Sequence, residues 1–172
     1  MSCTRLISVD DAPELARLLL KNREFMAPWS PLRDETYYTD SGQSAVIRDL
    51  LAQHAQGSAL PHVVLDTDRI VGAITLSGIV RGPFQSANLG YWIDAAHNSR
   101  GLATAATAET TRVAFDELGL HRIQAGTLLH NAASQKVLQR NGFERFGLAP
   151  QYLKIAGRWQ DHVLFQVLNS EP

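Results

Sequence analysis

The sequence predicts one α/β domain built around a mixed β-sheet. Hairpin-like pairs of β-prone runs occur towards both ends of the chain, and two strand-turn-helix units lie between them. Hairpins make antiparallel neighbours and strand-helix-strand units make parallel ones, so we expect about six or seven strands with flanking helices. The 172 residues, 45% of them hydrophobic, fit a single domain over 1–172.

The N-terminal part of the chain predicts a strand, a helix and an aromatic loop. Residues 4–8 are β-prone, and the aspartate pair at 10–11 can cap a helix that runs to about Asn22 with leucines on one face. Prolines and aromatic residues interrupt 25–41, which is too broken for one helix and too aromatic for a solvated linker. We expect a binding loop or covering flap there.

A helix, a hairpin and a further strand follow. A helical segment over 41–56 stops before Gly57, and β-rich runs at 62–65 and 70–76 flank a turn-forming Asp-Thr-Asp sequence. The run over 86–93 predicts a strand that leads directly into the next turn. These elements form the first half of the expected sheet.

The C-terminal part predicts two more helices among the remaining strands. A helix that follows the turn at residue 97 ends near Gly119, and a second one covers 131–141. The runs that are rich in β-branched and aromatic residues cover 121–127, 143–148, 152–155 and 159–167. A tight Ala-Gly turn joins the last two of these runs.

Charge and cysteine content narrow the class of protein. Sixteen Lys and Arg against seventeen Asp and Glu leave a formal charge of −1, which favours neither a direct nucleic-acid partner nor a membrane surface. Cys3 is the only cysteine, so internal disulfides and multi-cysteine metal sites are excluded. The six histidines have no metal-ligand spacing, and we expect no metal. No signal or membrane-spanning pattern is present, so a cytoplasmic location is expected.

The segment from His97 to Ala105 predicts a turn that binds phosphate. The first N–H groups of a helix have no partner within it and carry the positive end of its dipole. Gly101 permits a sharp turn and close approach to an anion, and the alanines that follow keep the helix slim. Ordinary capping of the helix is the competing interpretation.

A second segment, Asn131 to Phe143, has the pattern Asn-x-x-Ser in a helix that ends in Gly-Phe. Together with Asn98 to Ala103, it resembles the GNAT superfamily of acyl-CoA N-acyltransferases, whose pyrophosphate turn reads Q/R-x-x-G-x-G/A. The resemblance is closer to the ribosomal-protein alanine N-acetyltransferases of RimJ/RimL type. The segments that carry this closer similarity are Asn22 to Phe25, Pro28-Trp29, Leu89 to Tyr91 and Tyr152 to Val163.

The resemblance implies a GNAT-like splayed sheet and acetyl-CoA as cosubstrate. The pantetheine arm would lie in the gap after the strand at 86–93 and pair with main-chain groups of Trp92 and Ile93. A backbone N–H there would stabilise the oxyanion. The side chain of Asn131 would bond pantetheine, and Ser134 would act on the leaving thiolate as the catalytic hydroxyl. The remaining residues expected to bind the cofactor are Asn98, Ser99, Arg100, Gly101, Leu102 and Ala103.

The acceptor is expected to be a protein N-terminal α-amine of the ribosomal-protein type. The residues expected to bind it are Phe25, Trp29, Tyr91, Gln151 and Tyr152. Two alternatives remain open: a small amine such as an antibiotic or polyamine, and a CoA-binding module without turnover. Either a monomer or a homodimer fits the sequence.

Two departures from the family bear on the chemistry. Asn98 and Ser99 replace the usual Gln or Arg and Gly of the turn, and Gln151 stands where the branch often has a carboxylate base. Roughly a tenth of an α-amine is free base near neutral pH, whereas a lysine would face about 3 kcal/mol more. The missing base therefore favours an α-amine acceptor. Water, His130, His162 or Asp161 would carry the proton away.

Overall fold

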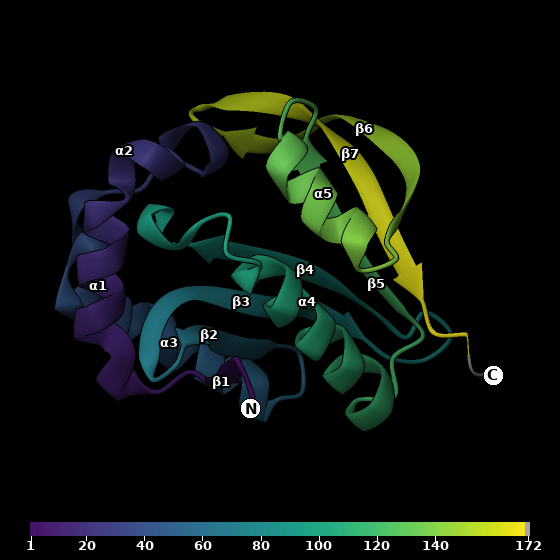
Figure 1. Ribbon diagram of the computed structural model, residues 1–172, viewed down its shortest axis with the longest axis horizontal. Coiled ribbons are helices and arrows are strands. Elements are labelled where there is room, and N and C mark those ends of the chain that lie inside the picture. Colours follow the sequence, from purple (N-terminus) through teal and green to yellow (C-terminus); the bar gives the residue numbers. More distant parts are fainter. Residues whose placement is uncertain (171–172) are drawn as a thin grey trace.

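The computed structural model describes residues 1–170, which fold around one seven-stranded sheet (Figure 1). Its spatial order is β1-β2-β3-β4-β5-β7-β6, and every neighbouring pair is antiparallel except β4 with β5. The strands are β1 Thr4–Leu6, β2 Leu60–Asp66, β3 Arg69–Val80, β4 Ser86–Ile93, β5 Arg122–Leu128, β6 Glu144–Ile155 and β7 Arg158–Leu168. The expected mixed sheet with flanking helices is confirmed.

One expected strand boundary is wrong. The runs at 143–148 and 152–155 were predicted as two strands, but they belong to the single strand β6. Its pairing with β7 shifts register between Ala149 and Leu153, and Gln151 between them has φ +47°. The irregularity interrupts the alternation of side chains along the strand but does not end the strand. In the sequence, this interrupted alternation looks like a turn between two strands.

The helices are α1 Ala12–Lys21, α2 Arg23–Met26, α3 Asp40–Ala55, α4 Leu102–Arg112 and α5 Ala132–Arg140. A π-helical turn over Val113–Glu117 extends α4 towards Gly119. The aromatic segment at 25–41 forms short helical turns, Ala27–Trp29 and Glu35–Tyr38, and no continuous helix. Its prolines explain this interruption, because a proline lacks the N–H that a helix interior requires.

Two hydrophobic cores form on the two faces of the sheet, because successive strand residues point to opposite sides. Ile74 and Leu76 of β3 belong to the larger core, where they join Ala106 of α4 and Leu138 of α5. The smaller core lies under α1 and α3 and contains Leu15, Ile47 and Val63 among others. Each fully buried aliphatic side chain contributes about 1.5–3 kcal/mol to folding.

The sheet opens between its two parallel strands. Strand β4 pairs with β5 only at Ser86–Asn88, opposite Arg122–Gln124. Beyond this point β4 continues along β3 to Ile93, while β5 continues along β7 to Leu128. The two halves of the sheet therefore diverge, and helices α4 and α5 lie over this region (Figure 1).

Candidate active site

The diverging part of β4 has one paired edge and one open edge. Trp92 and Ile93 pair with Ala73 and Gly72 of β3 on one side. On the other side, the described residues provide no strand partner beyond Asn88. A ligand with amide groups can bond such an edge as an added strand would.

The turn before α4 has the geometry of an anion site. Gly101 has φ +78°, and a Cβ added there would meet nothing within 4 Å, so the surface at this point is open. Helix α4 starts at Leu102 with no side-chain capping bond at its N-terminus. The competing interpretation of this turn was ordinary capping of the helix, but no side chain caps α4 in the described structure. Its first N–H groups can bind an anion.

Two residues of the turn have features that the sequence could not reveal. Ser99 has φ +61°, a left-handed conformation in which glycine is less strained. The side chain of Arg100 forms an ion pair of 2.6 Å with Asp66, the last residue of β2. Arg100 would have to leave Asp66 to contact a phosphate.

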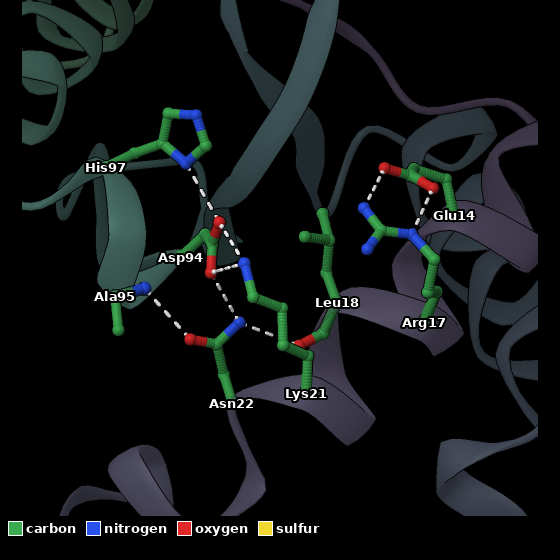
Figure 2. A network of polar contacts seen from close by, with 8 residues as sticks. All are labelled: Glu14, Arg17, Leu18, Lys21, Asn22, Asp94, Ala95 and His97. Atoms are coloured by element: carbon green, nitrogen blue, oxygen red, sulfur yellow. Dashed lines mark hydrogen bonds and ion pairs between the residues drawn. The ribbon is translucent and has the colours of Figure 1, made fainter.

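A buried aspartate ties this turn to helix α1 (Figure 2). The side chain of Asp94 is 1% exposed and accepts hydrogen bonds from Asn22 Nδ2 at 2.8 Å and Lys21 Nζ at 3.0 Å. The Nδ1 atom of His97 lies 2.8 Å from Asp94 Oδ2, and Asn22 Oδ1 accepts from the backbone N–H of Ala95. These contacts hold both ends of the short segment that leads to the phosphate turn.

The electrostatics of Asp94 follow from its partners. Burial alone would raise the pKa of Asp94, but the bonds from Asn22, Lys21 and His97 lower it to about 2. The carboxylate is therefore charged throughout the physiological range. Sequence reasoning did not find this network, although a charged residue directly after a buried strand was an available signal.

Asn131 and Ser134 meet at the start of α5, as their spacing indicates. Asn131 is the N-cap of the helix, and its Oδ1 accepts a bond of 3.2 Å from the backbone N–H of Ser134. The Asn-x-x-Ser spacing therefore has a structural use in capping. It also leaves the amide nitrogen of Asn131 and the hydroxyl of Ser134 for other contacts.

Tyr91 joins Ser134 across the opening of the sheet. Its phenol oxygen lies 2.8 Å from Ser134 Oγ and 3.3 Å from the carbonyl oxygen of Ser134. Burial raises the pKa of Tyr91 to about 12, so its hydroxyl keeps its proton at neutral pH. Tyr91 had been expected to bind the acceptor, and its contact with Ser134 was not foreseen.

A cavity of about 510 Å³ lies on the face of the sheet that α1 and α3 cover. Its floor is made of small residues of β3 and β4, where Ala73 pairs with Trp92 and Thr75 pairs with Gly90. Small side chains leave the space that larger ones fill in the neighbouring core. Tyr91 and Trp92 also line this cavity. The ring of Tyr91 packs against the larger core on the α4 and α5 face, where it contacts Ser134, so residue 91 lies at the border between the cavity and the Ser134 contact.

The other residues expected at an acceptor site lie outside the lining of this cavity. Phe25 is 49% exposed, and Trp29 packs against the ring of His130 with 5.2 Å between centroids. The ring of Tyr152 meets that of His162 edge to face at 5.6 Å. Tyr152 lies on β6, and the β6–β7 turn meets the segment after Trp29, where the Ala156 N–H donates to the carbonyl of Ser30.

The residues considered as proton acceptors all have structural partners. Asp161 Oδ1 accepts from the backbone N–H of Gln151 at 2.9 Å, and His162 Nδ1 lies 2.9 Å from the carbonyl oxygen of Gln160.

Among residues 1–170 no group of three His, Cys, Asp or Glu is placed to hold a metal ion. No helix in this range is long and apolar enough to cross a membrane.

A splayed mixed sheet, an open helix N-terminus and a cavity near the partly buried Tyr91–Ser134 hydroxyl pair are features that an α/β acyltransferase requires. The family model described as an acetyltransferase (GNAT) domain matches residues 3–144. The chain belongs to the GNAT acetyltransferase family. It is an acetyl-CoA-dependent N-acetyltransferase, and the expected family and activity are confirmed.

Named relatives cover almost the whole chain. It is 36% identical to the probable N-acetyltransferase YjcK of Bacillus subtilis over 169 residues, 97% of this chain and 93% of the relative. It is 39% identical to the [ribosomal protein uS5]-alanine N-acetyltransferase of Escherichia coli over 162 residues, 93% of this chain and 84% of the relative.

Solved structures show the same architecture. The ribosomal-protein-S5-alanine acetyltransferase of Vibrio fischeri superposes with a TM-score of 0.93 at 34% identity, covering 98% of this chain and 93% of that one. RimJ of Mycobacterium smegmatis, in complex with CoA-disulfide, has a TM-score of 0.95 at 30% identity. The match covers 98% of this chain and 82% of that one.

Proposed function

We propose that this enzyme acetylates the N-terminal α-amine of a protein, with ribosomal proteins as the acceptor class. The observation that carries the proposal is the position of Tyr91 on β4: the strand forms the floor of the cavity, and the side chain of Tyr91 contacts Ser134 on the other face of the sheet. This position connects a space for the acceptor with the hydroxyl expected at the leaving group. The E. coli and V. fischeri relatives, named for ribosomal-protein alanine acetylation, support the acceptor class.

Acetyl-CoA would bind along the opening between β4 and β5. The open edge at Trp92 and Ile93 would pair with the pantetheine amides, and the amide of Asn131 would bond the same arm. The pyrophosphate would accept bonds from the turn that precedes α4. The residues proposed for this turn are Asn98, Ser99, Arg100, Gly101, Leu102 and Ala103. The CoA-disulfide complex of M. smegmatis RimJ supports this class of ligand.

The proposed reaction is a direct transfer in a ternary complex. The lone pair of the free amine attacks the thioester carbonyl carbon, the C–N bond forms, and the C–S bond breaks with its electrons leaving on sulfur. A backbone N–H of the open edge would stabilise the charge on the carbonyl oxygen. Ser134 would donate its proton to the thiolate and regain one from solvent, while the proton of the attacking amine leaves to water.

Tyr91 would position the Ser134 hydroxyl in this step. Because the phenol stays protonated, it can donate to Ser134 Oγ and leave the serine proton directed elsewhere. Such a contact lowers the rotational freedom of the Ser134 hydroxyl. It also stabilises the partial negative charge that forms on Ser134 Oγ as the serine gives up its proton. Tyr91 thus acts through Ser134, as a positioning residue.

The missing carboxylate base supports an α-amine acceptor. Gln151 and Asn88 have amide side chains, which do not accept a proton near neutral pH, so neither position supplies a base. An α-amine has a pKa of about 7.7–8.0 and is partly neutral at physiological pH, unlike a lysine at about 10.4. Phe25, Trp29, Gln151 and Tyr152 would contact chain segments of the acceptor outside the cavity.

Cavity charge disfavours the alternative of a polycationic small amine. Among the described lining residues, Arg23 and Arg33 carry positive charge at neutral pH, and none is Asp or Glu. Arg23 is compensated by its ion pair with Glu35, but no such pair is formed by Arg33, so a polyamine or an aminoglycoside would meet like charge there.

We infer further that residues 1–172 act as one domain and that the enzyme works in the cytoplasm. It would act as a monomer or a homodimer, without direct contact to nucleic acid.

Acetyl-CoA-dependent thiol release separates the candidate functions. Peptides that begin with Ala, Ser or Met would be compared with small amines, and mass spectrometry would locate the added acetyl group. We expect α-amine acetylation of at least one peptide. Acetylation confined to lysine side chains or small amines would refute the proposal. Acetyl-CoA binding without acceptor-dependent thiol release would instead favour a binding module.

A further inference from the structure

Two arginines line the cavity, and they differ in their partners. Arg23 makes two bonds to the carboxylate of Glu35, of 2.6 and 3.0 Å, and its guanidinium also lies 4.4 Å from the ring centre of Tyr38. Arg33 lies 4.6 Å from the ring centre of Tyr37. Within residues 1–170 no carboxylate forms an ion pair with Arg33. Its guanidinium is therefore the available charge of the cavity.

The ring under Arg33 is held in place by its neighbours. The backbone N–H of Tyr37 donates to Asp34 Oδ1 at 3.2 Å, and its carbonyl accepts from Gln43 Nε2 at 2.6 Å. Burial is the main cause of the raised pKa of Tyr37, as expected for a ring packed into the cavity wall. A guanidinium stacked on a fixed ring loses less freedom when it binds a planar anion.

Neither of the two nearby carboxylates, Asp34 and Glu35, forms an ion pair with Arg33. Glu35 is engaged by Arg23, and the side chain of Asp34 accepts from the hydroxyl of Thr36 and from the Tyr37 N–H. Both lie at the start of the short helical turn over Glu35–Tyr38. Arg33 is thus an exposed cation in the lining of the cavity, and none of the described lining residues is acidic.

We propose that Arg33 binds a carboxylate of the acceptor, so that the preferred acceptors are N-terminal peptides with Asp or Glu among their first residues. This inference rests on the proposed acetylation of α-amines in the same cavity. A guanidinium binds a carboxylate through two parallel hydrogen bonds, a geometry that an amide or an ammonium ion cannot reproduce. Arg33 is then a specificity residue that selects the acceptor without taking part in the chemistry.

The test uses paired peptides that differ only by Glu or Gln at one position, placed in turn at positions two to five after an N-terminal Ala. The wild-type enzyme is expected to use one Glu peptide with a kcat/KM about fivefold to tenfold above its Gln partner. The difference should appear in KM and shrink at high ionic strength, because the site is partly exposed.

The variant Arg33→Gln is expected to abolish this preference by raising KM for the Glu peptide while leaving the Gln peptide unchanged. Arg48→Gln is the matched control, since Arg48 is exposed on α3 outside the cavity lining and its loss changes net charge equally. Equal use of Glu and Gln peptides by the wild type, or an equal loss for both in Arg33→Gln, would overturn the inference. Failure to acetylate any peptide α-amine would instead overturn the proposed function.

Discussion

The phenol oxygen of Tyr91 lies 2.8 Å from the hydroxyl oxygen of Ser134, so a strand residue of one half of the enzyme contacts the first turn of α5. The strand also forms the floor of the cavity, and the helix start follows the diverging strand β5. The contact thus joins the two sides of the proposed transfer reaction. Four further features of the fold lead to measurable consequences.

Removing the phenol should slow turnover through Ser134. Tyr91→Phe deletes one hydrogen bond worth about 0.5–1.5 kcal/mol, so kcat should fall roughly twofold to tenfold with little change in KM for acetyl-CoA. Ser134→Ala should cost more, and adding Tyr91→Phe to it should have little further effect. Steady-state kinetics of the four proteins test this double-mutant cycle, and additive losses would contradict the positioning role.

Filling the cavity floor should weaken acceptor binding alone. A Cβ at Gly90 would meet nothing within 4 Å, and Gly90 lines the cavity, so Gly90→Val should fold and occupy acceptor space. We expect KM for a peptide acceptor to rise at least about fivefold, equivalent to about 1 kcal/mol, while KM for acetyl-CoA stays constant. Gly147→Val is the matched control, because it also has open space but lies on β6. Equal effects of the two variants would exclude the cavity as the acceptor site.

Breaking the buried network should destabilise the protein and weaken cofactor binding together. Asn22 is 2% exposed, and Asn22→Leu leaves Asp94 and the Ala95 N–H with fewer partners, at a cost of about 2–3 kcal/mol. Urea unfolding measures this loss, and KM for acetyl-CoA should rise because the phosphate turn loosens. Arg17→Gln on α1, the helix that ends just before Asn22, is the control, since its ion pair with Glu14 is exposed and worth under about 1 kcal/mol (Figure 2). A normal KM in a destabilised Asn22→Leu protein would separate the network from cofactor binding.

The low pKa of Asp94 predicts a loss of stability in acid. Its pKa is lowered from 3.8 to about 2 on folding, so the folded state favours the ionised form. The resulting stabilisation, about 2 kcal/mol, is fully present above pH 5 and is lost as pH falls from about 4 through 2. In urea unfolding between pH 6 and 2.5, Asp94→Asn should show a smaller decline than the wild type. Parallel curves for the two proteins would contradict the assignment.

The strained residue of the phosphate turn should accept glycine. Ser99 has φ +61°, where a residue with a Cβ is disfavoured, so Ser99→Gly should stabilise the protein by up to about 1 kcal/mol. Ser99→Ala keeps the Cβ and serves as the control. Thermal unfolding should show a higher Tm for the glycine variant only. A lower Tm would mean that the serine side chain compensates for the strain.

Much of the fold and part of the site could be predicted from local patterns. The glycine at 101 and the Asn131–Ser134 spacing each act within one turn, and the structure has Gly101 in the left-handed region and Asn131 as the helix cap. The single strand β6 was missed because a register shift near Gln151 resembles a turn. Local conformation is set by nearby side chains, so sequence alone reveals it well.

By itself, the sequence determined the family, the mixed sheet and the two motifs of the donor site. The tertiary structure decided which distant groups meet: Tyr91 with Ser134, 43 residues apart, and Asn22 with Asp94, 72 apart. It also decided that Arg33 lines a cavity whose floor is made by β3 and β4. The physical reason is that these contacts depend on strand order and on the divergence of β4 from β5, and neither is encoded in the spacing of neighbouring residues.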